Sequence, residues 1–204
     1  GLYKAKRYLD DIQKAEEDED EALPEYDAKC EALVPLLNGE IEAHFHCHRA
    51  DDIQTAIRIS REFHLKCVII HGTEGYKITD GLSYYNVPVI AGPILCDRCK
   101  PEMKDLDLKN AGILWKNGVK VALCTDHTVI PIQYLPLSAA LAVKGGMPYN
   151  AALRAITSDA AQILGIADRV GSIAVGLDAD LQLYNGDPLG LDDPCLVMVK
   201  GEII

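Results

Sequence analysis

Residues 66–71 read Lys-Cys-Val-Ile-Ile-His, a short apolar run that ends on a histidine. Such a run is typical of a strand buried on both faces, as the strands of parallel sheets are. The residues before it favour a helix whose apolar face is formed by Ile53, Ala56, Ile57 and Ser60. Either Asp51 or Asp52 can cap that helix. A helix that leads directly into a buried strand predicts an α/β protein with parallel strands.

The alternation of helix and strand continues along the chain. Strands are expected over residues 41–46, 66–71, 87–91 and 119–124, with helices up to about residue 85 and over 108–117 between the later ones. Parallel strands with helices outside them occur in doubly wound sheets and in (β/α) barrels. A closed barrel needs eight strand–helix units, and this chain shows about four.

The N-terminal part of the chain differs from this repeat. Residues 2–15 and 25–38 are predicted to be helical, and the acidic block 16–21 lies between them without interruption. A block of like charges is typical of a solvated helix end or a mobile linker. We therefore expect residues 1–40 to form a helical segment with an acidic linker.

The C-terminal part also has a character of its own. Helices are expected over 135–145 and 149–164, and short strands with turns follow over 172–175, 180–184 and 196–199. So few short strands do not fold well alone. Residues 41–168 are therefore expected to form the main body, and residues 169–204 a small β unit that packs on it.

The composition excludes some partners. A net charge of -11 argues against nucleic acid, because phosphate neutralisation needs clustered Lys and Arg. No apolar run is long enough to cross a membrane and no signal-peptide pattern opens the chain. Seven cysteines without disulfide-scaffold spacing favour a reducing cytoplasm. The single CxxC pair, Cys96 and Cys99, is weak evidence for zinc or redox chemistry. Because the chain starts at Gly1 and not at Met, we expect it to be part of a longer protein.

Histidines gather where predicted strands end. His44, His46 and His48 alternate, so they share one face if the strand runs through all three. His71 ends the next strand, and Asp126 lies just beyond the fourth. In parallel α/β folds ligands bind at the carboxyl ends of strands. A single His at a strand end is more often structural, but imidazoles and a carboxylate at equivalent places in successive units favour a zinc-type metal site.

Other reactive side chains have simpler interpretations. His64 lies at a helix end on the opposite side of such a fold, where a structural role is expected. Cys47 and Cys124 alternate away from the neighbouring candidate ligands, which favours core packing over metal binding. The long loop 92–107 follows the third predicted strand, and we expect it to lie on the substrate side of the site.

Several of these motifs together resemble one family. They are His-Cys-His-Arg-Ala-Asp-Asp-Ile at 46–53, Ile-His-Gly-Thr-Glu-Gly-Tyr at 70–76 and Thr-Asp-His at 125–127, followed by the helix and turn sequences 155–165 and 170–181. In their order and spacing they resemble the amidohydrolase superfamily, and within it most closely imidazolonepropionase-like proteins. The resemblance covers about residues 30–204.

The resemblance implies a fold and a set of roles. The family fold is a (β/α)8 TIM-like barrel with a small composite β-sandwich domain, of which this chain matches the C-terminal half. His46 matches the metal ligand after the fifth strand, His71 the ligand after the sixth, and Asp126 the ligand and proton shuttle after the eighth. His48 matches either an alternative metal ligand or a residue that contacts a metal ligand and orients it. His127 would support the site by its position. Arg49 and Tyr76 face the same rim, where contact with substrate is one role and a structural role is the slightly favoured alternative for each.

The chain departs from the family pattern in one respect. The family also uses a His-x-His pair after the first strand and usually a Lys or Glu at the fourth, and neither is in place here, so half the barrel is absent.

The resemblance implies a catalytic function once the barrel is complete. A complete barrel would hold Zn²⁺ or another divalent metal, one ion or two, and activate water toward a non-peptide C–N bond of a cyclic amide or amidine. His71 would polarise the carbonyl and Asp126 would pass the proton to the leaving nitrogen.

The 204-residue chain alone is expected to be inactive. The partners expected are a small-molecule substrate and either further copies of the chain or the missing N-terminal half. The alternative is a non-catalytic half-barrel that serves as an oligomerising or partner-binding scaffold. A nucleotide-binding domain is disfavoured because no glycine-rich phosphate loop follows any strand.

Overall fold

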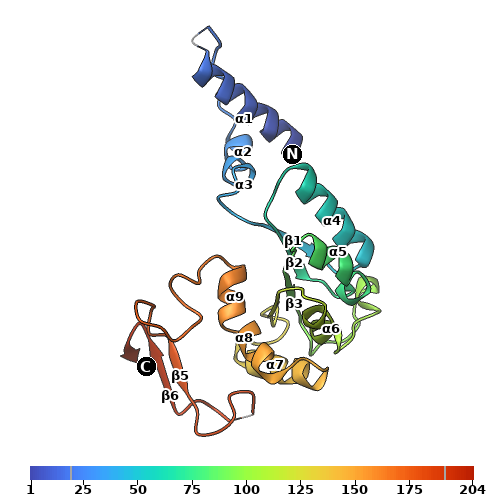
Figure 1. Cartoon of the computed structure of the whole chain (residues 1–204), viewed down its shortest axis with the longest axis vertical. Coiled ribbons are helices and arrows are strands. Elements are labelled where there is room, and N and C mark those ends of the chain that lie inside the picture. The colour runs from blue at the N-terminus through green and yellow to red at the C-terminus, as the bar shows by residue number, and fades with distance from the viewer. Residues whose placement is uncertain (19, 191) are drawn as a thin grey trace.

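A parallel four-stranded sheet forms the centre of the molecule (Figure 1). The computed structural model describes residues 1–18, 20–190 and 192–204. The sheet contains β1 (Ala43–Cys47), β2 (Cys67–His71), β3 (Val89–Ala91) and β4 (Val121–Leu123), in that order, and each neighbouring pair is parallel. The predicted α/β class with about four strand–helix units is confirmed.

One face of the sheet is covered by the helices that follow its strands. These are α4 (Ala50–Glu62), α5 (Thr79–Tyr84) and α6 (Asn110–Lys116), with a 3₁₀ turn at Gly75–Lys77 before α5. Each contributes a side chain that is fully buried against the strands: Ile53, Leu82 and Leu114. Ile69 and Val89 meet them from the sheet, as strand alternation requires.

The other face of the sheet is only partly covered. There α9 (Ser158–Ile163) contacts β4, and its Ile163 packs with Val68 and Ala122. α7 (Leu135–Lys144) and α8 (Tyr149–Ala155) also contact β4, but their buried alanines belong to the core on the face that carries α4, α5 and α6. At the β1 end His44 and His46 remain exposed. The outer edges of β1 and β4 have no partner strand within the described residues, so the sheet is open there. Further 3₁₀ turns lie at Pro101–Met103 and Ile132–Tyr134.

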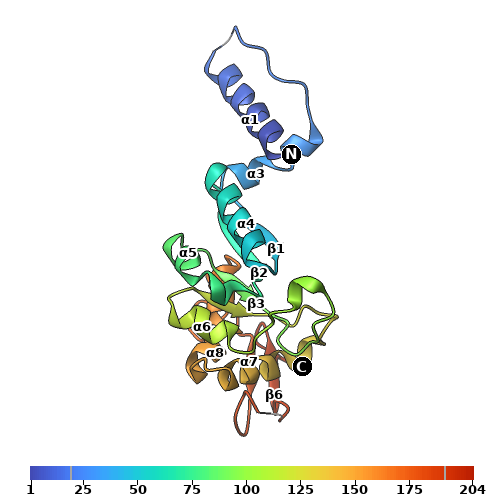
Figure 2. The same cartoon turned by 90° about the vertical axis from the view of Figure 1, so that its right-hand side faces the viewer.

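The N-terminal segment projects from one end of the body (Figures 1 and 2). It contains α1 (Leu2–Glu17), α2 (Ala28–Glu31) and α3 (Val34–Leu37). The single helix predicted over 25–38 is wrong: Pro35 lies in the first turn of α3, where its missing N–H does no harm, but it cannot continue the helix before it. Asp27 caps α2 by accepting from the Lys29 and Cys30 backbone N–H groups. One residue of the acidic block, Glu19, lies outside the described residues.

The C-terminal unit is a small antiparallel sheet of β5 (Leu181–Leu183), β6 (Leu196–Val199) and β7 (Glu202–Ile203). The strand predicted over 172–175 is wrong: that segment pairs with no described strand, and Ile173 and Val175 are almost fully exposed. The helix predicted over 149–164 is broken because Thr157 leaves the helical region, with φ -135° and ψ -99°, and begins α9. Leu189 is buried in the main core and anchors the unit to the body.

None of the helices in the described ranges is both long and apolar enough to cross a membrane. All seven cysteines are free thiols.

Candidate metal centre

Three imidazoles converge at the carboxyl ends of β1 and β2. His46 lies in β1, His48 directly follows that strand, and His71 ends β2. The ring centroids of His46 and His71 lie 4.4 Å apart, those of His48 and His71 lie 4.6 Å apart, and those of His46 and His48 lie 5.1 Å apart. Their candidate ligand atoms all lie within 4.8 Å of one another, and in the part of the chain that the structure describes they form the group able to share one metal ion. We call these three residues the histidine trio.

The backbone at the end of β2 brings His71 into the trio. Strand alternation places His71 on the same side as Ile69, toward the helices. Its φ of +73° leaves the extended conformation, and its ring instead contacts that of His46. Asp126, beyond β4, has a φ of +50°. Left-handed backbone at residues other than glycine costs on the order of 1–3 kcal/mol and often marks functional sites.

Hydrogen bonds fix two of the rings. His71 Nδ1 lies 2.6 Å from the Gly92 carbonyl oxygen, to which it must donate, so its Nε2 keeps a free lone pair. Nδ1 of His48 lies 2.7 Å from the Thr73 hydroxyl. Gly92 has a φ of +141°, and a Cβ there would lie 2.1 Å from the Cys124 carbonyl oxygen, so only glycine fits. Partners of this kind orient metal-binding imidazoles.

His48 and His71 favour neutral imidazole, the form that binds metal. Burial lowers the pKa of His48 to about 4, and the neighbouring His71 and His46 add to this effect. Burial also lowers the pKa of His71, against the opposing effect of the Gly92 carbonyl. The positive charge of Lys100 contributes to both reductions in pKa, so loop 92–107 places this charge near the trio.

The other predicted site residues lie around the trio. Asp126 is exposed and does not belong to the 4.8 Å group. Its negative charge opposes the lowering of the His71 pKa. Arg49 pairs with Asp51 at 2.7 Å on the surface. The Tyr76 hydroxyl donates to the Asp105 carbonyl at 3.3 Å, and His127 is exposed.

His44 lies apart from the trio. Its Nε2 is 3.4 Å from Glu42, and it is not a member of the 4.8 Å group. β1 ends at Cys47, so the condition under which all three alternating histidines would share one face, a strand running through them all, is not met.

The sequence did not single out Thr73, Gly92 or Glu74 as residues that support the trio. Thr73 and Gly92 contact its rings, and Glu74 accepts from the Ala50 backbone N–H at 2.9 Å. Glu74 therefore caps α4, whereas Asp51 and Asp52, predicted as caps, lie within its first turn. The position of Thr73 and Glu74 directly after His71 and Gly72 could have marked them as candidates. Their partners, His48 and Ala50, follow another strand and could not be identified from the sequence.

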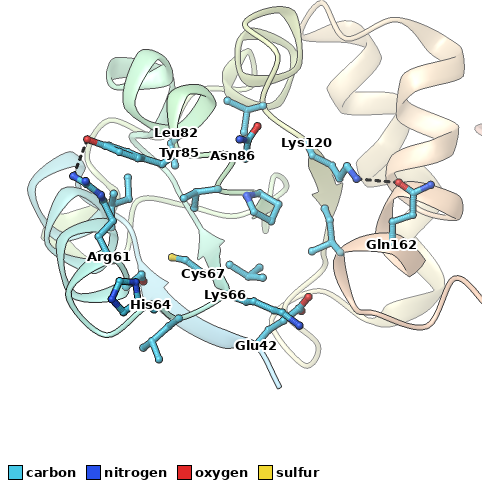
Figure 3. A pocket seen from close by; sticks show the side chains of 18 of the residues that line it. Glu42, Arg61, His64, Lys66, Cys67, Leu82, Tyr85, Asn86, Lys120 and Gln162 are labelled. Carbon is cyan, nitrogen blue, oxygen red and sulfur yellow. Dashed lines mark hydrogen bonds between the residues drawn. The ribbon is translucent and has the colours of Figure 1, made fainter. Parts of the chain in front are cut away.

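A separate cavity of about 680 Å³ lies at the opposite ends of the strands (Figure 3). His64 lies in its wall, as expected for a residue on that side. Arg61, Lys66 and Lys120 also line it; Arg61 donates to the Tyr85 hydroxyl, and Lys120 to Gln162. α4, α5 and α6 all end here, and positive charges offset the negative ends of helix dipoles. These cations therefore have a structural explanation, and the cavity is not part of the metal centre.

A parallel α/β sheet with imidazoles converging at the carboxyl ends of its strands places the chain among proteins that can hold a divalent metal at that edge. The chain belongs to the amidohydrolase family: the model described as "Amidohydrolase family" matches residues 39–204. The family resemblance inferred from the sequence is confirmed.

Relatives support this assignment. The chain is 30% identical over 189 residues, 89% of its length, to "Amidohydrolase tasK" of Hapsidospora irregularis, and 35% identical over 85 residues, 40% of its length, to an imidazolonepropionase of Cupriavidus pinatubonensis. A solved amidohydrolase from Thermotoga maritima is 40% identical with a TM-score of 0.93, and the match covers 99% of this chain. The matches span only 19% and 20% of the two curated relatives and 53% of the solved chain.

Proposed function

We propose that this chain is the C-terminal half of a metal-dependent hydrolase that cleaves non-peptide C–N bonds, such as those of cyclic amides or amidines. The observation that carries the proposal is the convergence of His46, His48 and His71 at the carboxyl edge of the sheet. Membership of the amidohydrolase family supports hydrolase activity at the general level. Neither the convergence of the histidines nor the family match supports the alternative of a non-catalytic scaffold.

The residues present fit a divalent metal. Imidazole nitrogen suits Zn²⁺, and structural and catalytic zinc sites commonly use several such ligands. The rings of His48 and His71 are already oriented through Nδ1, and their low pKa values keep them unprotonated near neutral pH. We propose zinc as the resident ion.

The chemistry divides between the metal and the chain. A bound zinc ion supplies Lewis acidity that makes water a nucleophile near neutral pH. Asp126, exposed at the same edge, would accept the proton of that water and return it to the leaving nitrogen. His71 would help to polarise the substrate carbonyl. Loop 92–107 would bring Lys100 to the substrate side of the site.

The isolated chain has only part of this machinery. Its sheet is open at both edges within the described residues, and the solved relative is about twice as long. We propose that further strands complete the barrel and add ligands, supplied by the rest of a longer protein or by an associated chain. The 204-residue chain alone is then expected to bind metal without substantial turnover.

Zinc binding by the isolated chain tests the proposal. We expect close to one equivalent of zinc after metal loading and desalting, measured by elemental analysis. The variants His46→Ala, His48→Ala and His71→Ala should each lose most of it. His44→Ala is the matched control, because His44 lies on the same strand outside the trio and should leave zinc content unchanged. Equal zinc content in all five proteins, or none in the wild type, would contradict the proposal.

A further inference from the structure

Glu74 is a buried carboxylate close to the trio. The residue is 7% exposed, although burying an ionised carboxylate costs several kcal/mol unless it is paired and hydrogen-bonded. Its partners are few. One oxygen accepts from the Ala50 backbone N–H at 2.9 Å, and the other from the Lys77 ammonium at 2.9 Å.

The first partnership acts on the segment that carries His48. Ala50 is the first residue of α4, and Arg49 at its N-cap supplies no side-chain hydrogen bond. The Glu74 carboxylate fills that place and complements the positive end of the helix dipole. The Glu74 backbone N–H also donates to the His48 carbonyl at 2.8 Å, while Thr73 holds the His48 ring at 2.7 Å. Residues 73 and 74 thus hold the turn from His48 to Ala50 at three points.

The second partnership reaches loop 92–107. Lys77 Nζ is shared between Glu74 and Asp105, which belongs to that loop. Asp105, and then Glu74, raise the pKa of Lys77, so the lysine remains charged between the two carboxylates. The Tyr76 hydroxyl donates to the Asp105 carbonyl and strengthens the same connection.

We propose that Glu74 is a positioning residue that holds His48 in place beside His46 and His71 and ties loop 92–107 to the same site. The part concerning His48 rests on the proposed metal function. The part concerning the loop rests on geometry alone. A single buried carboxylate thereby links a candidate ligand to the loop on the substrate side.

Cobalt binding tests the first part, with Co²⁺ alone as the probe because its visible absorption reports ligand geometry. Glu74→Ala is expected to weaken Co²⁺ affinity about ten-fold or more, as loss of a group that orients a ligand does, and to change the spectrum. Glu74→Gln keeps an oxygen for the Ala50 N–H and should keep the wild-type spectrum. Glu102→Gln is the charge control, because Glu102 affects His48 only through a through-space effect on its pKa.

Limited trypsin digestion tests the second part. Loop 92–107 contains Arg98 and Lys104 as cleavage sites, and Lys100 is protected by the following Pro101. In Glu74→Gln an amide NH₂ replaces the carboxylate oxygen that accepts from Lys77, and this group is a donor that cannot accept. The substitution should therefore speed cleavage in the loop without speeding cleavage at Lys4 or Lys6 in α1. Glu102→Gln should not speed it.

The outcomes separate the two proposals. Wild-type affinity and spectrum in Glu74→Ala, or effects equal to those of Glu102→Gln, would overturn the role of Glu74 toward His48. If Glu74→Ala does not fold, Glu74→Gln decides both parts. A wild-type cleavage rate overturns the link to the loop, and a changed Co²⁺ spectrum, although an acceptor for the Ala50 N–H remains, overturns the role toward His48. If the wild type binds no Co²⁺, the metal function fails while digestion still decides the loop.

Discussion

Within the described residues, the side chain of Thr73 is the hydrogen-bond partner of the His48 ring. Thr73 is buried, and its hydroxyl lies 2.7 Å from His48 Nδ1. If that hydroxyl accepts, Nδ1 carries the proton and Nε2 offers a lone pair to a metal. The neighbouring His71 obtains the same orientation from a backbone carbonyl, which no substitution can remove directly. Thr73 is therefore the position where orientation can be tested by mutation.

We predict that Thr73→Val, which keeps the shape but removes the hydroxyl, weakens zinc affinity about 10- to 100-fold, the usual effect of losing such a partner. Thr73→Ser retains the hydroxyl and should stay close to the wild type. Competition with a chromophoric chelator measures both affinities. Equal affinities in the valine and serine variants would show that Thr73 does not orient His48.

At the residue level the structure brings together three of the histidines that the sequence singled out, but it leaves Asp126, also predicted as a ligand, outside their group. His46, His48 and His71 could be selected because they end strands that must be neighbours in a parallel sheet. The roles of Thr73, Gly92 and Glu74 could not, since each acts on a residue from another strand. The left-handed turn that brings His71 beside His46 also has no sequence signature, because histidine is not a residue that requires it.

At the level of elements, Asp27 is one of two acidic residues that connect α2 to α1, the other being Glu31, which accepts from the Tyr8 hydroxyl. Its carboxylate pairs with Lys4 of α1 and accepts from the first N–H groups of α2. The hydrogen bond from Lys4, followed by that from the Cys30 N–H, lowers the pKa of Asp27 from 3.8 to about 2. A lowered pKa means that the ionised group stabilises the folded arm above pH 3.8, and that this stabilisation is lost as the pH falls through about 2.

We predict that Asp27→Asn opens the arm at neutral pH, seen as faster hydrogen exchange of the amides of residues 28–31. The difference from wild type should shrink between pH 3.8 and about pH 2 and vanish below that. Asp10→Asn, on the same arm, serves as the control and should exchange like the wild type. A wild-type advantage that persists unchanged below about pH 2 would show that Asp27 ionisation is not its source.

The positions of strands and helices were predicted well where the element has an apolar face that packs against the core. All four central strands lie within or one residue from their predicted ranges, because each has apolar side chains that pack against the covering helices. The break at Pro35 was missed although proline ends the helix before it, which is a signal in the sequence. The break at Thr157 has no such signal, because threonine is tolerated both within a helix and at its start. The segment 172–175 has strand-like composition but no described partner, and composition alone does not form a strand.

The surface of the whole molecule includes open sheet edges and exposed apolar side chains. The sheet has two unpaired edges in the described ranges, and the β1 end of its less covered face is exposed, including His46. Ile173, Val175 and Ile203 are exposed on the C-terminal unit as well. Open edges and exposed apolar groups favour association with other chains. The sequence predicted an incomplete barrel from its four strand–helix units, and that half-barrel stays a prediction.

We predict that the portion of the Thermotoga maritima amidohydrolase left uncovered by this chain, produced separately, binds it in a 1:1 complex when the two are co-refolded. The 40% identity and the TM-score of 0.93 over 99% of this chain make the two surfaces comparable. Light scattering measures the stoichiometry, and zinc should be held more tightly in the complex because additional ligands close the site. The His46→Ala chain is the matched control: it should form the same complex without the gain in zinc affinity, because the barrel surface is intact while the trio is not. A chain that stays monomeric and unassociated in the mixture would contradict completion by a second half, since its open sheet would then need no partner.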